Sequence, residues 1–555
     1  MAKIREDCLP PSDLLPEYII PPEYADLPDE LNLTEEILDI NIKQGRGDNP
    51  AIKFMDKTLT YQQVYDSVNK LGNSLKDLGV EPLDRVALRM TNGPAAIIAN
   101  FAIMKIGAVP ITMSPLWSKD EISFAANNAE TVALFSTAPI LAEVEKARDD
   151  MEFTKHVIIA GGDAEELESK GFLSFEKLVE AGNPELEPDK MKKDDLALIL
   201  YTSGTTGPPK GCCHFVGATL IETDLVGKHV WKLGPEDTLG GGAPVSFAAG
   251  YGTFALIPFR FGSAVSLIPR FEPQEMLKLV EKHKITVFTG LPTAYRVLLV
   301  QENFSDFDFS SVRMYTTGGD SLTPATFDAW KAKTGHEIYE GLGATEMIHL
   351  VTSNSVAPKP NSASIGQKLP GFDILVLDEE GEECKPQEVG SLAIKGPTGI
   401  CYWKPYVDNE RLLENQKSAV RNGWNILGDA VYSDEEGYIF FVSREGDMIK
   451  SSGYRIGPAE VEEALVLHPA VADACVIGSP DPVRGENTVA YCVLAEGTEE
   501  SDELKQEVVE SCRDHIAVYK LPRELHIVES LPKTPTGKLL RRIVRDWDKE
   551  RAAAK

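Results

Sequence analysis

Short apolar runs alternate with helix-like segments through most of the chain, and this alternation limits the fold more than any other feature. The runs RVALRM (85–90), TVALFST (131–137) and KHVIIAGG (155–162) have the length and composition of buried strands. The same rhythm returns between residues 194 and 346, where LALILYT, SAVSLIP, ITVFTGLP and RMYTTGG are separated by segments such as PQEMLKLVEKH. Strands joined by helices are typical of parallel sheets, so we expect an α/β fold whose large domain has two stacked α/β layers.

The most apolar stretch, PAAIIANFAIMKIGAVPITM (94–113), has the hydropathy of a membrane span. Lys105, Gly107 and Pro110 interrupt it, which favours a buried helix followed by a short strand. Before it, LTYQQVYDSVNKLGNSLKDLG has apolar residues at helical spacing, and Gly79 is the expected C-cap. We therefore predict helix-on-sheet packing here and no membrane span.

The pattern changes twice toward the C-terminus. After about residue 360, FDILVLDEEGEE and GSLAIKGP indicate strands and tight turns, and hence a β-rich subdomain. Beyond VSREGDMIKSSGYRIG, helices and strands with their own apolar set indicate a small α+β domain. We place the large N-terminal domain at residues 1–445 and the C-terminal domain at 446–555.

Composition narrows the classes of partner. The 555-residue chain has a formal net charge of -30, which disfavours nucleic acid and anionic membranes because both require a basic surface. The eight cysteines include no C-x-x-C pair, and the charged, proline-containing start does not have the apolar core of a signal peptide. We expect reduced thiols and a cytoplasmic protein.

The stretch YTSGTTGPPKG (201–211) follows an apolar run and has the composition of a phosphate-binding loop. Its glycines allow the backbone N–H groups to face an anion, its hydroxyls add donors, and Lys210 adds a point charge. Its lysine is followed by Gly211 and not by Ser or Thr, so it does not match the common GxxxxGK[ST] loop. On these residues alone, a polyphosphate cradle and an ordinary surface loop are equally supported.

Further stretches follow in a fixed order: TTGGDSL (316–322), YEGLGATEM (339–347), GWNILGD (423–429), REGDMIKSSGYRIGPAEVE (444–462) and PKTPTGK (532–538). Together with YTSGTTGPPKG they resemble the signature motifs of the adenylate-forming superfamily, which contains acyl-CoA synthetases, luciferases and peptide-synthetase adenylation domains. The resemblance covers roughly residues 40 to 545. It implies that ATP activates a carboxylate to an acyl-adenylate with release of pyrophosphate, and that the acyl group then passes to a thiol.

The resemblance also assigns the nucleotide site. It implies that the hydroxyl-rich loop holds the β- and γ-phosphates and that the TE pair, Thr345 and Glu346, meets the α-phosphate and Mg²⁺. It also implies that GGD and EGLG enclose the adenine, that Asp429 holds the ribose, and that Arg444 contacts the ribose or a phosphate. The implied nucleotide residues are Thr202, Ser203, Gly204, Thr205, Thr206, Lys210, Gly318, Gly319, Asp320, Glu340, Gly341, Leu342, Gly343, Thr345, Asp429 and Arg444, with Glu346 as the metal ligand. Leu342 replaces the aromatic residue frequent in the family, so adenine stacking becomes apolar packing.

Lys538 matches the lysine that stabilises charge in the adenylation transition state, where a compact ammonium bridges the carboxylate and the α-phosphate. The family then rotates its C-terminal domain, so the small domain is expected to be mobile. Lys538 leaves the site, and Gly453 and Tyr454 enter beside the CoA thiol arm. Gly446 occupies the hinge position, where Asp or Lys is usual in the family.

The acyl pocket is expected from APVSFAAGYGTF (243–254), TTGGD and the segment after Gly341. The implied lining is Phe247, Ala248, Ala249, Tyr251, Gly341 and His349. The pocket is apolar, and it has no acid placed to pair an α-ammonium group, which favours an aromatic or alicyclic acid. The N-terminal segments LPPSDLLPEY (9–18) and LNLTEEILD (31–39), together with GLGATEMIH, look like the corresponding segments of benzoate and 2-aminobenzoate CoA ligases.

Three alternatives remain open at this point: a medium-chain or branched aliphatic acid, a stand-alone enzyme that loads a carrier protein, and core packing as the role of the aromatic residues. The absence of a carrier module after Lys538 favours free CoA as the acceptor. The expected partners are therefore a small carboxylic acid, ATP, CoA and Mg²⁺. The sequence does not decide the oligomeric state, and a homodimer is the assembly we consider.

Overall fold

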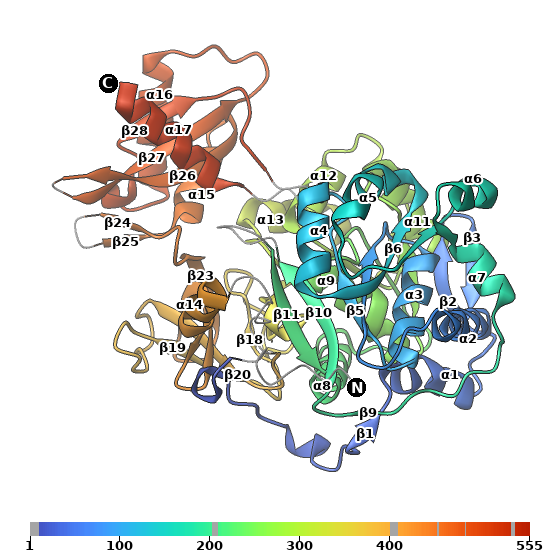
Figure 1. Cartoon of the computed structure of the whole chain (residues 1–555). Helices are drawn as coiled ribbons and strands as arrows, with labels where there is room; N and C mark the ends of the chain where they lie inside the picture. Colours follow the sequence, from blue (N-terminus) through green and yellow to red (C-terminus); the bar gives the residue numbers. More distant parts are fainter. Residues whose placement is uncertain are drawn as a thin grey trace. The chain divides into compact units, whose positions relative to one another are not determined.

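The computed structural model describes residues 10–202, 209–399, 409–451, 454–482, 484–533 and 539–554 (Figure 1). The chain folds into two compact units. The first contains Met1–Ile374 and Ile394–Asn425, and the second contains Leu375–Ala393 and Ile426–Lys555. Each unit mixes helices with sheets, and the expected α/β fold is confirmed.

The first sheet of the larger unit runs in the order β11-β10-β5-β4-β6-β7-β8. Its strands are parallel, except that β11 runs antiparallel to β10. The strands are β4 Arg85–Arg89, β5 Val109–Thr112, β6 Thr131–Thr137, β7 His156–Ala160, β8 Leu173–Ser174, β10 Leu196–Thr202 and β11 Lys210–Phe215. The helices of this part are α2 Tyr61–Asp77, α3 Pro94–Lys105, α4 Lys119–Asn128, α5 Leu141–Ala147, α6 Ala164–Ser169 and α7 Phe175–Ala181. Gly79 follows α2 at φ +83°, a conformation that suits glycine after a helix.

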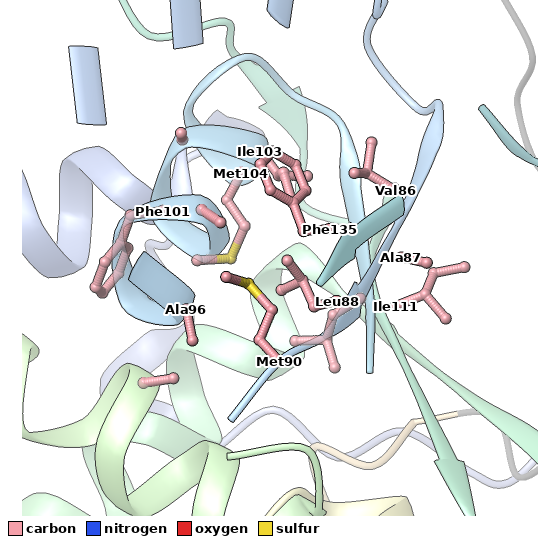
Figure 2. Close-up of a cluster of buried hydrophobic side chains, with 14 of the residues drawn as sticks. Val86, Ala87, Leu88, Met90, Ala96, Phe101, Ile103, Met104, Ile111 and Phe135 are labelled. Carbon is pink, nitrogen blue, oxygen red and sulfur yellow. The ribbon is translucent and has the colours of Figure 1, made fainter. Parts of the chain in front are cut away.

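The apolar stretch 94–113 is a helix and a strand, as the sequence predicts. Figure 2 shows side chains of α3, among them Ala96 and Met104, packed against Leu88 of β4 and against Met90, which directly follows β4. Lys105, at the end of α3, is fully buried and pairs with Asp39 at 2.7 Å. The helix is thus apolar on all sides because it lies inside the protein.

The second sheet runs in the order β16-β15-β14-β12-β13-β2-β3, and all its strands except β3 are parallel. The strands are β2 Pro50–Phe54, β3 Lys57–Thr60, β12 Thr238–Gly241, β13 Ala264–Leu267, β14 Val287–Gly290, β15 Met314–Thr317 and β16 Ile338–Glu340. The helices are α8 Val216–Leu225, α9 Ala248–Tyr251, α10 Ile257–Arg260, α11 Pro273–His283, α12 Pro292–Leu299 and α13 Pro324–Thr334. One buried cluster includes residues of both sheets, and Phe259 of α10 meets Phe101 of α3 edge to face at 5.1 Å. Shared helices therefore join the two sheets into one core.

The expected strands after residue 360 are present as β19 Asp373–Leu377, β20 Gly390–Lys395, β22 Trp424–Ser433 and β23 Ile439–Arg444, and α14 Asn409–Ala419 precedes β22. The C-terminal part contains a sheet ordered β25-β24-β27-β26, with β28 beside β27. Its elements are β24 Ile449–Ser451, β25 Tyr454–Ile456, α15 Pro458–Val466, β26 Val471–Asp481, β27 Gly485–Leu494, α16 Asp502–Ser511, β28 Glu524–Ile527 and α17 Arg541–Ala554. A separate buried cluster, which includes Val461, Leu465 and Val476, gives this part its own core. Within the described ranges, no helix has both the length and the apolar character needed to cross a membrane.

Candidate active site

The predicted phosphate loop connects two hydrogen-bonded strands. β10 ends at Thr202 and β11 begins at Lys210, and these two residues are register partners. The backbones at both ends of the loop are therefore fixed by the first sheet. Ser203, Gly204, Thr205 and Thr206 lie outside the described residues.

The two glycine-rich motifs meet at the carboxyl ends of neighbouring parallel strands. β15 leads into Gly318–Asp320 and β16 leads into Gly341–Gly343. A Cβ on Gly318 would lie 2.8 Å from the carbonyl oxygen of Gly341, so a larger residue at position 318 would displace the backbone. Gly319 has φ +82°, which also favours glycine. The fold thus places the predicted adenine segments side by side, at the strand ends where α/β proteins bind ligands.

Glu340 is the last residue of β16, and its side chain points into the protein. It is 6 % exposed, and its Oε1 accepts a hydrogen bond from the backbone N–H of Leu322 at 3.0 Å. This contact ties the segment after Asp320 to the end of β16. Leu342 is also buried, which is consistent with an apolar surface beside these glycines.

The TE pair is held by its backbone. Nε2 of His214 donates to the carbonyl oxygen of Thr345 at 2.8 Å, and the N–H of Gly399 donates to the carbonyl oxygen of Glu346 at 2.9 Å. His214 is the fifth residue of β11, the strand that begins at Lys210. The phosphate-loop hairpin and the TE pair are therefore joined by a direct hydrogen bond.

A buried carboxyl lies behind His214. Oε2 of Glu222, in α8, is 3.7 Å from Nδ1 of His214, and both side chains are buried. Burial lowers the pKa of His214 to about 4 and raises the pKa of the Glu222 carboxyl well above its ordinary value. His214 is therefore neutral near pH 7 and carries its proton on Nε2, and burial favours the neutral form of the Glu222 carboxyl. The sequence motifs did not indicate either residue.

The predicted acyl segment is partly in the core. Tyr251 is buried, and its hydroxyl donates to Oδ1 of Asn100 at 2.5 Å, whereas Phe247 and Ala248 are half-buried and Ala249 is exposed. Along this segment Tyr251 belongs to the core, whereas Phe247, Ala248 and Ala249 keep part of their surface exposed.

His349 packs against the residues that follow Tyr251. Its Nε2 lies 3.0 Å from Oγ1 of Thr253, its ring meets Trp231 edge to face at 4.9 Å, and burial lowers its pKa to about 4. A Cβ on Gly252 would lie 2.8 Å from Cδ2 of His349. The structure therefore brings His349 against the helix that carries Tyr251.

The predicted ribose residues pair with each other in the second unit. Asp429 of β22 and Arg444 of β23 are register partners, and Nη1 of Arg444 lies 2.9 Å from Oδ1 of Asp429. The Asp429 side chain is 3 % exposed and that of Arg444 is 53 % exposed. The carboxylate is thus fixed in place, while the guanidinium is exposed to solvent.

The expected hinge residue lies beside a contact to the C-terminal helix. Gly446 has no atom within 4 Å of an added Cβ, and Nη2 of Arg545 in α17 donates to its carbonyl oxygen at 2.8 Å and contacts Asp447 at 2.7 Å. Tyr454 is exposed and stacks on Tyr519 with ring centroids 4.2 Å apart. Gly453 and Lys538 lie outside the described residues.

Comparisons with known proteins agree with this arrangement. Residues 40–403 match the family model for the AMP-binding enzyme, and residues 460–538 match that for the AMP-binding enzyme C-terminal domain. The acetyl-coenzyme A synthetase of Bacillus subtilis (strain 168) is 31% identical over 94% of this chain and 91% of its own length. The mitochondrial acyl-coenzyme A synthetase ACSM3 of Mus musculus is 31% identical over 93% of this chain and 90% of its own length.

Among solved structures, the anthranilate CoA ligase AuaEII in complex with anthranoyl-AMP has a TM-score of 0.88 and 29% identity, over 95% of this chain and 99% of its own. A benzoate CoA ligase from Burkholderia xenovorans LB400 has a TM-score of 0.82 and 26% identity, over 93% of this chain and 100% of its own. The similarity therefore extends over both units of the chain.

Proposed function

The chain belongs to the AMP-binding enzyme family and is an AMP-forming acid–thiol ligase, and on that premise we propose that its substrate is an aromatic or alicyclic carboxylic acid. The acid reacts with ATP to give an acyl-adenylate and pyrophosphate. The CoA thiol then attacks the acyl carbon, a thioester forms, and AMP leaves. The observation that carries the proposal is the mostly apolar set of residues around Tyr251 and the packing of His349 on Trp231, together with the similarity to two ligases of aromatic acids.

The nucleotide-binding residues act mainly by holding ATP in a fixed orientation. The strand ends at Gly318 and Gly341 form the adenine site, and Asp429 accepts hydrogen bonds from the ribose hydroxyls. Lys210 places its charge near the β- and γ-phosphates, and the hydroxyls between Thr202 and Thr206 donate to the same groups. Each contact fixes ATP with its α-phosphate directed at the carboxylate of the acid.

Glu346 fits a magnesium role in this site. The described residues contain no cluster of three or more His, Cys, Asp or Glu side chains that could hold a metal. Mg²⁺ in nucleotide enzymes is commonly held by one or two carboxylates together with substrate phosphates, so a single half-buried glutamate is sufficient. When bound, Mg²⁺ offsets phosphate charge, and the backbone contacts of His214 and Gly399 keep the TE pair in position.

Lys538 stabilises charge in the first half-reaction, and rotation about Gly446 then replaces it with Gly453 and Tyr454 for the second. Glycine tolerates the dihedral change that a hinge requires. Cytoplasmic location stays a prediction from the sequence, and the oligomeric state stays open.

A panel of acids tests the substrate class. The chain, ATP, Mg²⁺ and CoA are mixed with benzoate, 2-aminobenzoate, cyclohexanecarboxylate, acetate, hexanoate and 2-methylbutanoate, and pyrophosphate release is measured. We expect the highest kcat/KM with a ring-bearing acid. The similarity to an acetyl-coenzyme A synthetase favours the aliphatic alternative, and a clear preference for acetate or hexanoate would replace our assignment with it.

A further inference from the structure

A small cavity lies within the first unit, at the carboxyl edge of the first sheet. Its wall is mostly apolar and comes from β4, β5, α3 and the α9 region; the lining residues are Leu88, Met90, Ala96, Ile97, Asn100, Thr112, Val245, Ser246, Tyr251 and Ala255. Leu88, Met90 and Ala96 form part of the packed group in Figure 2. The cavity has room for about one water molecule.

Three side chains in this wall each have one polar atom without a hydrogen-bond partner within the part of the chain that the structure describes. They are Asn100, through Nδ2, and Thr112 and Ser246, through their hydroxyls. They are 1 %, 1 % and 4 % exposed, so solvent does not satisfy them. Buried polar atoms in proteins are nearly always paired with protein or water. Three such atoms around one cavity therefore indicate that something polar occupies it.

The unpaired atoms of the cavity wall determine which kind of group can bind there. Oδ1 of Asn100 accepts from the hydroxyl of Tyr251, so the amide of Asn100 presents its N–H donors as the unpaired group. The hydroxyls of Thr112 and Ser246 can donate or accept. No charged side chain is found among the described residues that line the cavity, so an ionised group would lose its solvation without compensation. The complementary occupant is a small neutral oxygen.

The cavity shares residues with the predicted acyl segment and lies next to the strand that leads into the phosphate loop. Ser246 and Tyr251 flank Phe247–Ala249 of the acyl segment, and Thr112 is the last residue of β5. Thr112 is the register partner of Leu200, two positions before Thr202 at the start of the phosphate loop. Two residues of strand span about 7 Å, a distance comparable with the length of a benzoate.

We infer that this cavity is the far end of the acyl site and that it receives a neutral oxygen of the acyl group, a hydroxyl or a carbonyl, in place of a water molecule. The inference rests on the proposed function. It narrows the substrate to an acid that carries such an oxygen away from its carboxylate. Asn100, Thr112 and Ser246 are then specificity-determining residues.

The test compares matched acids that differ by one oxygen. Pyrophosphate release is measured with benzoate and the three monohydroxybenzoates, and with pentanoate and 4-oxopentanoate. We expect one oxygen-bearing acid to exceed its parent by about tenfold or more in kcat/KM, because a site built to hydrogen-bond an oxygen discriminates against an analogue without it. In the double variant Thr112→Val, Ser246→Ala this preference should fall below about twofold.

Thr219→Val is the matched control. The hydroxyl of Thr219 is also buried and unpaired within the described residues, but Thr219 lies in α8 and does not line the cavity. Thr219→Val should leave the preference for the oxygen-bearing acid unchanged. The double variant and the control should both fold, because each substitution removes a buried hydroxyl that has no hydrogen-bond partner within the described residues. Equal use of parent and oxygen-bearing acids by the wild type, or a preference that survives in the double variant, would show that the cavity holds only water and would overturn the inference while the ligase function stands. If no acid of any class releases pyrophosphate, the proposed function fails as well.

Discussion

Replacing His214 tests whether the TE pair is positioned from the phosphate-loop hairpin. In His214→Phe the carbonyl oxygen of Thr345 loses its donor, which lies 2.8 Å away in a fully buried place. An unmade buried hydrogen bond costs about 1–3 kcal/mol. If that cost appears in the placement of Glu346, kcat/KM falls roughly 5- to 150-fold.

The measurement is pyrophosphate release across a range of Mg²⁺ concentrations. We expect His214→Phe to lower kcat/KM and to raise the Mg²⁺ concentration needed for half-maximal rate, because Glu346 is the proposed metal ligand. His214→Gln keeps an N–H donor near the position of Nε2 and should recover part of the loss. Glu222→Gln should retain most of the activity, since burial raises the pKa of the Glu222 carboxyl and so favours a neutral group at this position, which the amide supplies.

His283→Phe is the control for loss of a buried histidine. His283 is buried and hydrogen-bonds Ser266 and the carbonyl oxygen of Met55, away from the TE pair. It should lower thermal stability with no change in Mg²⁺ dependence. The reasoning is refuted if His214→Phe affects only stability, as this control does. A loss in Glu222→Gln as large as in His214→Phe would show instead that Glu222 acts as an anion.

Three further outcomes are expected. Stability to urea should fall as the pH drops from about 6.5 to about 4, because burial lowers the pKa of His214 and His349 to about 4 and unfolding lets each histidine bind a proton. The free energy of unfolding should decrease by at most about 3 kcal/mol for each histidine. A urea midpoint that does not change with pH would contradict this. Lys105→Met should destabilise the chain by about 3–5 kcal/mol in thermal unfolding, since it leaves Asp39 buried without its partner, and an unchanged Tm would count against a charged pair. Lys538→Ala should block adenylate formation but spare thioester formation from supplied acyl-adenylate, and equal loss of both would remove its assigned role.

Local patterns predicted the elements well. The segment PQEMLKLVEKH is α11 and TPATFDAWKAKTG contains α13, because proline near the first turn and apolar residues at helical spacing act within one helix. The division of 94–113 into α3 and β5 was also correct, since Gly107 and Pro110 interrupt the helix locally.

Contacts between distant segments were not predictable in the same way. His214 lies next to Thr345 only because the hairpin of the first sheet and the loop after β16 come together in three dimensions. Its signal in the sequence, a histidine inside a strand-like run, is shared by many core histidines. The meeting of Gly318 with Gly341 was easier to anticipate, because the carboxyl ends of parallel neighbours lie at one edge.

The second unit takes residues 375–393 from the middle of the chain. During synthesis these residues leave the ribosome before residues 426–555, which supply the rest of their unit. At a synthesis rate of about 5–20 residues per second, roughly 10 s or more pass between the synthesis of residues 375–393 and the completion of residues 426–555. Most of the first unit has been synthesised by then. The charged sequence DEEGEE keeps residues 375–393 hydrated and resistant to aggregation.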